Sequence, residues 1–326
     1  MEDQAPWFLP AEDVAETGGT TAPLPQSDRL SLLNSAGWRE AERQLAADLA
    51  ELNFDRGRLS ERVAAGAGGV QRLALAEASS LSWWSGDRVT ADRLALWLSY
   101  RIGAPEEGGA GLIRTAWAAR RLASPGQGRG LAEAIATSLS DDGRVNAGLL
   151  ADVASEMEAV ADISTVTQGC ALCHLWRALD ERPEHLRGLE AAVLGARLAA
   201  GQAALPFLPV TLTGFSALTA SGGPETRLAG WISGAHRAVL SALMTLDRLT
   251  AWRARAKAET ADLQGRTPAL LIAAIAAHPM LAVPQAEAET GASRAAVQRN
   301  LDVLQSRGLI REVTGHGRFR VWTAAV

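Results

Sequence analysis

The sequence predicts a mainly α-helical protein, built as a helical bundle that is followed by a smaller C-terminal domain with a few short strands. About one residue in five of the 326 is alanine, and Lys257 is the single lysine among 32 basic residues, so arginine is abundant. Alanine and arginine favour helices, whereas the strand formers threonine, tyrosine, isoleucine and phenylalanine are scarce. Capping residues, prolines and glycines recur at intervals that suit the ends of helices.

The N-terminal segment, residues 1–26, is predicted to be a mobile arm. It is acidic, holds four prolines, and shows no basic stretch followed by an apolar one, which argues against a secretory signal. The longest apolar stretch of the chain, 270–283, is interrupted by His278 and Pro279 and falls short of the roughly 20 residues of a membrane helix. We therefore expect a cytoplasmic protein without a membrane partner.

Residues 27–265 are predicted to form the helical body. Ser27 is a suitable N-cap for a helix that begins at Asp28, and Thr90 is a suitable cap for a helix that continues to Tyr100. An apolar stretch at 204–224 lacks helical periodicity and is expected to pack against the body. Further helices are expected at 70–81, around Trp117, and at 131–139, 145–160, 164–180 and 184–202.

The longest predicted helix runs from Pro224 to Gln264, with Gly265 as its stop. Its apolar residues alternate at spacings of four and three, which is typical of a coiled coil and also of a helix in a bundle core. Two interpretations stay open: the stripe packs inside the body, which Trp231 and Trp252 favour by widening it, or it forms the seam of a homodimer. The stripe consists of Leu228, Ile232, Ala235, Val239, Ala242, Leu246 and Leu249.

The two cysteines, Cys170 and Cys173, precede His174 in the sequence CALCH, which has the spacing of a c-type haem attachment site. Apolar residues recur around them at helical spacing, so we interpret both cysteines as small core residues. A thioredoxin-type site would need a preceding strand, and a zinc site would need more ligands, for which His185 is the nearest candidate. We expect no cofactor and no metal.

Other catalytic signals are missing from the sequence. It holds no phosphate-binding loop, no dinucleotide-binding glycine motif and no HExxH metal motif, so no catalytic residue is assigned and the protein is not expected to be an enzyme. Trp83 and Trp84 cannot both face one core stripe of a helix, so we expect one of them in a pocket or partly exposed. We interpret the pair as core residues, with a ligand or partner surface as the alternative.

The C-terminal residues 266–326 differ from the rest of the chain in charge. Seven arginines and four acidic residues give this part a net charge of +3, whereas residues 1–265 carry −7. The overall net charge of −4 therefore averages over two oppositely charged parts. A small basic domain of this kind is typical of proteins that bind nucleic acid.

Prolines, glycines and a serine cap divide residues 266–326 into three short helices and two strands, which is the order of a winged helix-turn-helix domain. The strands alternate apolar and polar residues, and the glycine-rich tip between them is the wing. The helices are expected to begin at Thr267–Pro268, Pro284 and Ser293 and to end at His278–Pro279, Gly291 and Gly308, and the strands are expected at 309–313 and 319–322 around the tip 314–318.

The third helix is the candidate recognition helix. Val297, Leu301 and Leu304 fall at helical spacing and are expected to face inward, which turns the polar residues of its N-terminal half outward. Arginine can recognise guanine, glutamine can recognise adenine, and a serine at a helix start suits a phosphate. Arg307 and Arg311 are expected to be solvated, and a protein-interaction role is the alternative for the domain. The candidate DNA contacts are Ser293, Arg294, Gln298, Arg299 and Asn300 on the helix and His316, Arg318 and Arg320 on the wing.

Several segments resemble an uncharacterised bacterial family. They are LAEASSL (75–81), RLAGW (227–231), LDRLTAWRARAKAETADLQGRTP (246–268) and GASRAAVQRNLDVLQSRGLIREVTGHGRFRVW (291–322). That family joins a helical domain of unknown function to its own C-terminal helix-turn-helix domain. The likeness covers most of residues 28–326 and implies that the C-terminal domain binds double-stranded DNA.

A second resemblance is to Fic-type adenylyltransferases, which often end in a winged helix with an HP step like His278–Pro279. Their catalytic motif HPFxxGNGRxxR is absent here, and the body histidine in the corresponding region, His236, is followed by no glycine-rich loop. This resemblance therefore implies a helical scaffold and transfers no catalytic residue.

The sequence as a whole predicts a DNA-binding transcriptional regulator, in which the helical body dimerises or senses a ligand. Two alternatives stay open. One is a nucleotide-transfer activity on a Fic-like scaffold. The other is a plasmid-maintenance or toxin–antitoxin protein that uses its winged helix for protein contacts.

Overall fold

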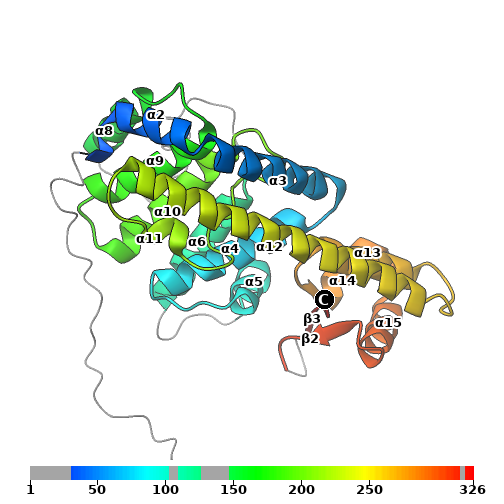
Figure 1. The fold of residues 1–326 in the computed structure, drawn as a ribbon. Helices are drawn as coiled ribbons and strands as arrows, with labels where there is room; N and C mark the ends of the chain where they lie inside the picture. The colour runs from blue at the N-terminus through cyan, green and yellow to red at the C-terminus, as the bar shows by residue number, and fades with distance from the viewer. Residues whose placement is uncertain (1–30, 103–108, 126–146, 316–319) are drawn as a thin grey trace, which may run out of the picture.

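The computed structural model of the chain describes residues 31–102, 109–125, 147–315 and 320–326, and helices dominate these ranges (Figure 1). A helical body precedes a C-terminal module, residues 266–326, which combines three helices with a small sheet. The predicted fold class is confirmed. The expectations for the arm, for the helix start at Asp28 and for the helix at 131–139 lie outside the described residues.

The described elements follow one another along the chain with short connections. The body contains α2 (Ser35–Gln44), α3 (Ala46–Ala65), α4 (Gly69–Trp84), α5 (Ala91–Tyr100), α6 (Gly109–Ala123), α8 (Ala147–Glu158), α9 (Thr165–Leu179), α10 (Glu184–Ala200), α11 (Ser216–Thr219) and α12 (Pro224–Glu259). The C-terminal module contains α13 (Thr267–Ala277), β1 (Leu281–Ala282), α14 (Val283–Thr290), α15 (Arg294–Ser306), β2 (Ile310–Glu312) and β3 (Val321–Ala324).

The centre of the body is the pair α9 and α10, which pack along each other. Gly169 of α9 faces Gly195 of α10, and a Cβ on either residue would overlap the carbonyl oxygen of the other. The two backbones can approach this closely only because both positions are glycine. These helices confirm the predictions at 164–180 and 184–202. No helix in the described ranges is both long enough and apolar enough to span a membrane.

The cysteine pair lies in the middle of α9, and both side chains are buried together with His174. Burial raises the pKa of both thiols, that of Cys173 to about 12. Burial, and then the positive charge of Arg227, hold the pKa of His174 far below its usual range, so the ring is neutral. Arg227 donates from Nη1 to His174 Nδ1 over 3.0 Å. The interpretation of both cysteines as core residues is confirmed. Among the described residues, no three His, Cys, Asp or Glu side chains are arranged to hold a metal ion.

The apolar stretch at 204–224 is fixed to α4 by two polar side chains of that helix. Glu77 is fully buried, and its Oε1 accepts hydrogen bonds from the N–H groups of Val210 and Thr211, each at 2.9 Å. Ser80 donates from its hydroxyl to the carbonyl oxygen of Thr211 over 2.7 Å. The stretch is packed, as predicted, but it is not entirely non-helical, because α11 forms one short turn within it.

The two adjacent tryptophans have different surroundings at the end of α4. Trp83 is half exposed, with 51% of its surface accessible. Trp84 packs against Gly188, where its ring occupies the space that a Cβ would take, and the guanidinium of Arg177 lies 5.3 Å above the ring. Trp84 is therefore part of the packed body, whereas Trp83 is open to solvent.

The long helix α12 decides between the two interpretations of its apolar stripe. Every residue of the stripe from Leu228 to Leu249 is buried within the chain, where α2, α3 and α9 pack against α12. The stripe therefore belongs to the core, and a homodimer seam made of these residues is excluded. The helix also stops at Glu259, short of the predicted end at Gln264, because Thr260 turns its hydroxyl back onto the carbonyl oxygen of Ala256.

The same helix connects the body with the C-terminal module (Figure 1). Residues of α12 up to Leu246 belong to the hydrophobic core of the body. Leu249, Trp252 and Ala256 belong instead to a second core, which they share with the helices and strands of the module. Trp252 also donates from Nε1 to the carbonyl oxygen of Leu309 over 2.6 Å. The division between the two cores thus falls inside α12, upstream of the boundary predicted after residue 265.

The buried carboxyl of Glu77 predicts a pH-dependent stability. Burial raises its pKa to about 7, against 4.5 for an ordinary glutamate. Between these values the folded protein binds more protons than the unfolded one, so the free energy of unfolding falls as pH rises, by up to about 3 kcal/mol. Glu77→Gln keeps an acceptor oxygen for Val210 and Thr211 but carries no charge, so we expect it to remove this fall.

The measurement is urea unfolding at several pH values from 4.5 to 8. Glu51→Gln is the control, because Glu51 is an exposed residue of α3 and its replacement should leave the wild-type pH dependence in place. An identical decline of stability in wild type and Glu77→Gln would show that the buried carboxyl is not its source.

Candidate nucleic-acid interface

The sheet of the C-terminal module has β3 at its centre, antiparallel to β1 on one side and β2 on the other. Trp322 of β3 pairs with Leu281 of β1, and Ala324 pairs with Ile310 of β2. The hairpin of β2 and β3 confirms the two predicted wing strands. The sequence gave no sign of β1, because two residues are too few to show an alternating pattern.

The helix α15 is set by the local signals that predicted it. The hydroxyl of Ser293 accepts a hydrogen bond from the N–H of Ala296 and so caps the helix. Gly291, in the turn before it, has a φ of 63°, in the left-handed region that glycine adopts without strain. Val297, Leu301 and Leu304 are fully buried, so the predicted inward face is confirmed.

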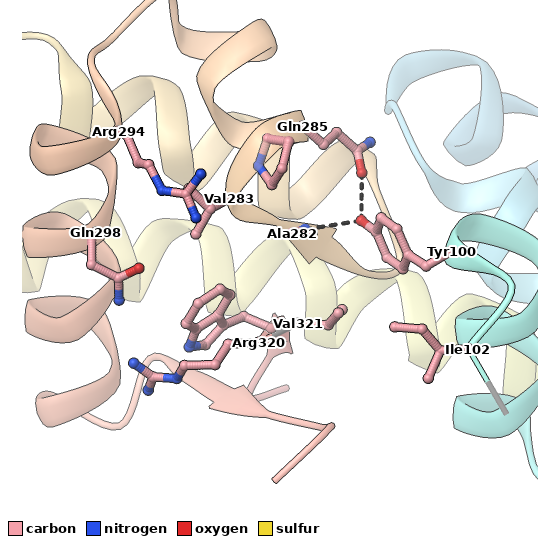
Figure 2. A pocket seen from close by; sticks show the side chains of 11 residues that line it. Tyr100, Ile102, Ala282, Val283, Gln285, Arg294, Gln298, Arg320 and Val321 are labelled. Atoms are coloured by element: carbon pink, nitrogen blue, oxygen red, sulfur yellow. Dashed lines mark hydrogen bonds between the residues drawn. The ribbon is translucent and has the colours of Figure 1, made fainter. Parts of the chain in front are cut away.

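Arg294 and Arg299 are exposed on the outward side of α15. Within the part of the chain that the structure describes, neither guanidinium makes a hydrogen bond or an ion pair. Gln298 is half-buried and donates from Nε2 to Asp302 Oδ1 over 3.0 Å, one turn further along. Arg294 and Gln298 are themselves one turn apart and extend from α15 into the same cavity (Figure 2). The outward side of α15 thus carries two cations and one amide.

Two other predicted contacts are engaged within the module. Asn300 turns back on its own helix and donates to the carbonyl oxygen of Ala296 over 2.8 Å. Arg320 donates to Glu312 at 2.7 Å and to Asp302 at 3.3 Å, and its guanidinium lies 4.8 Å above the ring of Trp322. The hydrogen bond with Glu312 is the first cause that holds the pKa of Arg320 above its usual value. His316 and Arg318 lie outside the described residues.

Two further arginines of the module form ion pairs instead of standing free in solvent. Arg307 pairs with Asp262, just beyond α12, with its Nη1 2.7 Å from Oδ1. Arg311 on β2 pairs with Asp92 on α5 of the body, with its Nη2 2.8 Å from Oδ2. Both contacts connect the module to segments outside it, which leaves Arg294 and Arg299 as the better candidates for a nucleic-acid partner.

The body is attached to the first helix of the module through the start of α4. Arg72 is largely buried and donates from Nη2 to the carbonyl oxygens of Ile275 and His278, at the C-terminal end of α13. Desolvation lowers its pKa to about 10, so the guanidinium stays charged, and a cation is favourable where a helix dipole is negative. Gly68, with a φ of 83°, lies against the last turn of α13, and a Cβ there would overlap the carbonyl oxygens of Ala276 and Ala277.

A second attachment lies at the end of α5. The hydroxyl of Tyr100 accepts a hydrogen bond from the N–H of Ala282 at 2.9 Å and donates to Gln285 Oε1 at 2.6 Å, at the start of α14 (Figure 2). Next to this contact is a cavity of about 580 Å³ between the body and the module. Tyr100 and Ile102 form the body side of the cavity, and α15 with its Arg294 forms the opposite side (Figure 2).

Sequence reasoning missed both body residues of this cavity. Tyr100 was recognised only as the end of a helix, and Ile102 was assigned no role. The chain holds a single tyrosine, which is the one signal that sets Tyr100 apart. Its contact partners lie about 180 residues away, so no local pattern could reveal them.

The attachment by Arg72 predicts a large loss of stability when its donors are removed. Arg72→Met keeps the length of the side chain but leaves the last carbonyl groups of α13 without partners, which we expect to cost about 2–4 kcal/mol in the free energy of unfolding. Arg62→Met is the matched control, since Arg62 forms an exposed ion pair with Asp247 that should contribute less than about 1 kcal/mol. Urea unfolding followed by tryptophan fluorescence measures both, and equal losses in the two variants would refute the prediction.

The comparisons with known proteins agree with the C-terminal geometry. Residues 262–318 match the MarR family. No curated protein matches the chain. The match is confined to the C-terminal part, so the Fic-like resemblance and the family resemblance of the helical body gain no support from it. The C-terminal module is thus a winged helix-turn-helix domain similar to those of the MarR family, whose members are DNA-binding transcription regulators.

Proposed function

We propose that this protein regulates transcription in the cytoplasm by placing α15 in the major groove of a DNA operator. The observation that supports this best is the outward side of α15, where Arg294 and Arg299 are exposed and without a partner among the described residues. Uncompensated cations on the N-terminal half of a recognition helix are what base edges and phosphates attract in this fold. The match of residues 262–318 to the MarR family supports the same role.

Each predicted contact has a distinct part in this proposal. Arg294 and Arg299 bind guanine bases or phosphates, and Gln298 exchanges its internal bond to Asp302 for an adenine. Ser293 and the start of α15 face a phosphate. His316 and Arg318 extend the contact from the wing to the backbone or the minor groove. Asn300 and Arg320 have a lesser part, because bonds within the module already use their donors.

The body has a mechanical role in the proposal and no catalytic one. Arg72, Tyr100 and Asp92 hold α13, α14 and β2 respectively, so the body fixes the orientation of the module. His236, the histidine that a Fic-like enzyme would need as its base, lies with Nε2 2.9 Å from Asp55 Oδ2. We therefore propose that the chain is not an enzyme.

A homodimer is also part of the proposal, because members of the MarR family typically dimerise. Since the buried stripe of α12 is excluded, the pairing surface has to be the outward side of that helix. Leu240 and Met244 lie there one turn apart with 39% and 56% of their surface exposed. Exposed apolar residues in a row on a long helix are typical of an interaction surface.

DNA binding tests the main proposal. An operator is first selected from fragmented genomic DNA by capture on the full-length protein, and dissociation constants are then measured on it by fluorescence anisotropy. Arg299→Ala and Arg294→Ala should each weaken binding by about 1–3 kcal/mol, roughly 5- to 150-fold. The logarithm of the association constant should fall with that of salt concentration, with a slope near −0.9 per phosphate neutralised. Arg43→Ala, which removes an exposed arginine of α2, is the control. Unchanged binding by both α15 variants would reject the recognition helix.

The dimer is tested separately by sedimentation velocity. We expect wild type to sediment as a dimer and Met244→Glu as a monomer, because dimerisation would bury the introduced charge. Ile113→Glu is the control, as Ile113 on α6 is as exposed as Met244 and lies outside α12. A monomeric wild type, or a dimer that persists in Met244→Glu, would place the pairing surface elsewhere or remove it.

A further inference from the structure

We infer that the helical body is part of the DNA-binding surface, and that the cavity between Tyr100, Ile102 and α15 takes a stretch of the DNA sugar–phosphate backbone. This inference rests on the proposed function. It goes beyond it because the body residues lie outside 262–318, the part that matches a family of DNA-binding proteins.

The polar lining of the cavity favours an anion. Arg294 and Arg320 supply two guanidinium groups, and Gln285 and Gln298 supply two amides. None of the described residues that line the cavity is an aspartate or a glutamate. A cavity that concentrates arginine donors and contains no carboxylate has the charge that a phosphate group requires.

The apolar lining agrees with a backbone better than with a phosphate ion alone. Ile102, Val283 and Val321 contribute aliphatic groups, and Trp322 contributes a ring. A phosphate ion is strongly hydrated and gains nothing from such walls. In DNA each phosphate is flanked by deoxyribose rings, whose C–H faces can pack on aliphatic and aromatic side chains while the phosphate meets the arginines.

The position of the cavity also fits a strand that leaves the major groove. Arg294 and Gln298 extend into the cavity from the N-terminal half of α15, the half that enters the groove in this fold (Figure 2). The strand bordering that groove has to pass between the recognition helix and the wing, and Arg320 and Trp322 of the wing hairpin form that side of the cavity. The body closes the far end with Tyr100 and Ile102.

The hydrogen bonds of Tyr100 explain why this wall is fixed. Its hydroxyl both accepts from Ala282 and donates to Gln285, so the end of α5 cannot move relative to the start of α14 without losing two bonds. Asp92, at the other end of α5, pairs with Arg311 on β2. The distance between Ile102 and Arg294 across the cavity is therefore set by the fold before DNA arrives.

A charge series at Ile102 tests the inference on the full-length protein and its selected operator. Ile102→Glu places a carboxylate beside the backbone and should weaken binding about tenfold or more, whereas the similarly sized neutral Ile102→Gln should change it by less than about threefold. Ile102→Lys should tighten binding and make the salt dependence steeper by about one phosphate. Hydroxyl-radical footprinting should show one stretch of backbone that Ile102→Glu alone leaves unprotected.

The outcomes separate this inference from the proposed function. Equal binding by the three Ile102 variants, with Arg299→Ala still weakened, would overturn the inference and leave the proposed function in place. Loss of every effect, including that of Arg299→Ala, would overturn both. Binding of free phenyl phosphate in calorimetry, together with an unchanged footprint in Ile102→Glu, would mark the cavity as a small-molecule site and also overturn the inference. Thermal unfolding of each variant controls for folding, and Ile102→Lys tests the idea by a gain if Ile102→Glu unfolds.

Discussion

The packing of one helix into two hydrophobic cores is the constraint on which the rest of this structure depends. Residues of α12 up to Leu246 complete the core of the body, and Leu249, Trp252 and Ala256 complete the core of the C-terminal module. A helix is stiff over this distance, because each residue is tied to its neighbours by the backbone hydrogen bonds of the turn. The two parts therefore cannot rotate freely about a linker, and the orientation of the recognition helix is fixed relative to the body.

Contacts far from α12 in the sequence support the same arrangement. Arg72 supplies the donors that the last carbonyl groups of α13 need, and Tyr100 joins α5 to the start of α14. Each of these contacts satisfies polar groups that would be costly to leave buried and unpaired. The body thus contributes to the module what a free helix-turn-helix domain has to obtain from solvent or from a partner, and it reaches the cavity beside α15 as a consequence.

Buried polar residues elsewhere explain motifs that suggest chemistry when they are seen as sequence. CALCH has the spacing of a haem site, but Cys170 and Cys173 are small residues that let α9 sit at the centre of the body. LAEASS contains Glu77, whose carboxyl binds the N–H groups of Val210 and Thr211 and so holds an irregular stretch in place. In both cases, spacing along one helix fits a function and a packing role equally well, and only the neighbouring helices distinguish them.

The sequence by itself determined the helical fold class, the C-terminal winged helix-turn-helix and the outward position of Arg294 and Arg299. These follow from short-range signals such as the cap at Ser293 and the inward spacing of Val297 and Leu301, which act within one or two turns of a helix. The tertiary structure alone decided that Arg320 is held by Glu312, that the stripe of α12 is an internal core, and that Tyr100 and Ile102 close a cavity beside α15. The physical reason is that these contacts join residues distant along the chain, so their partners depend on how whole helices pack.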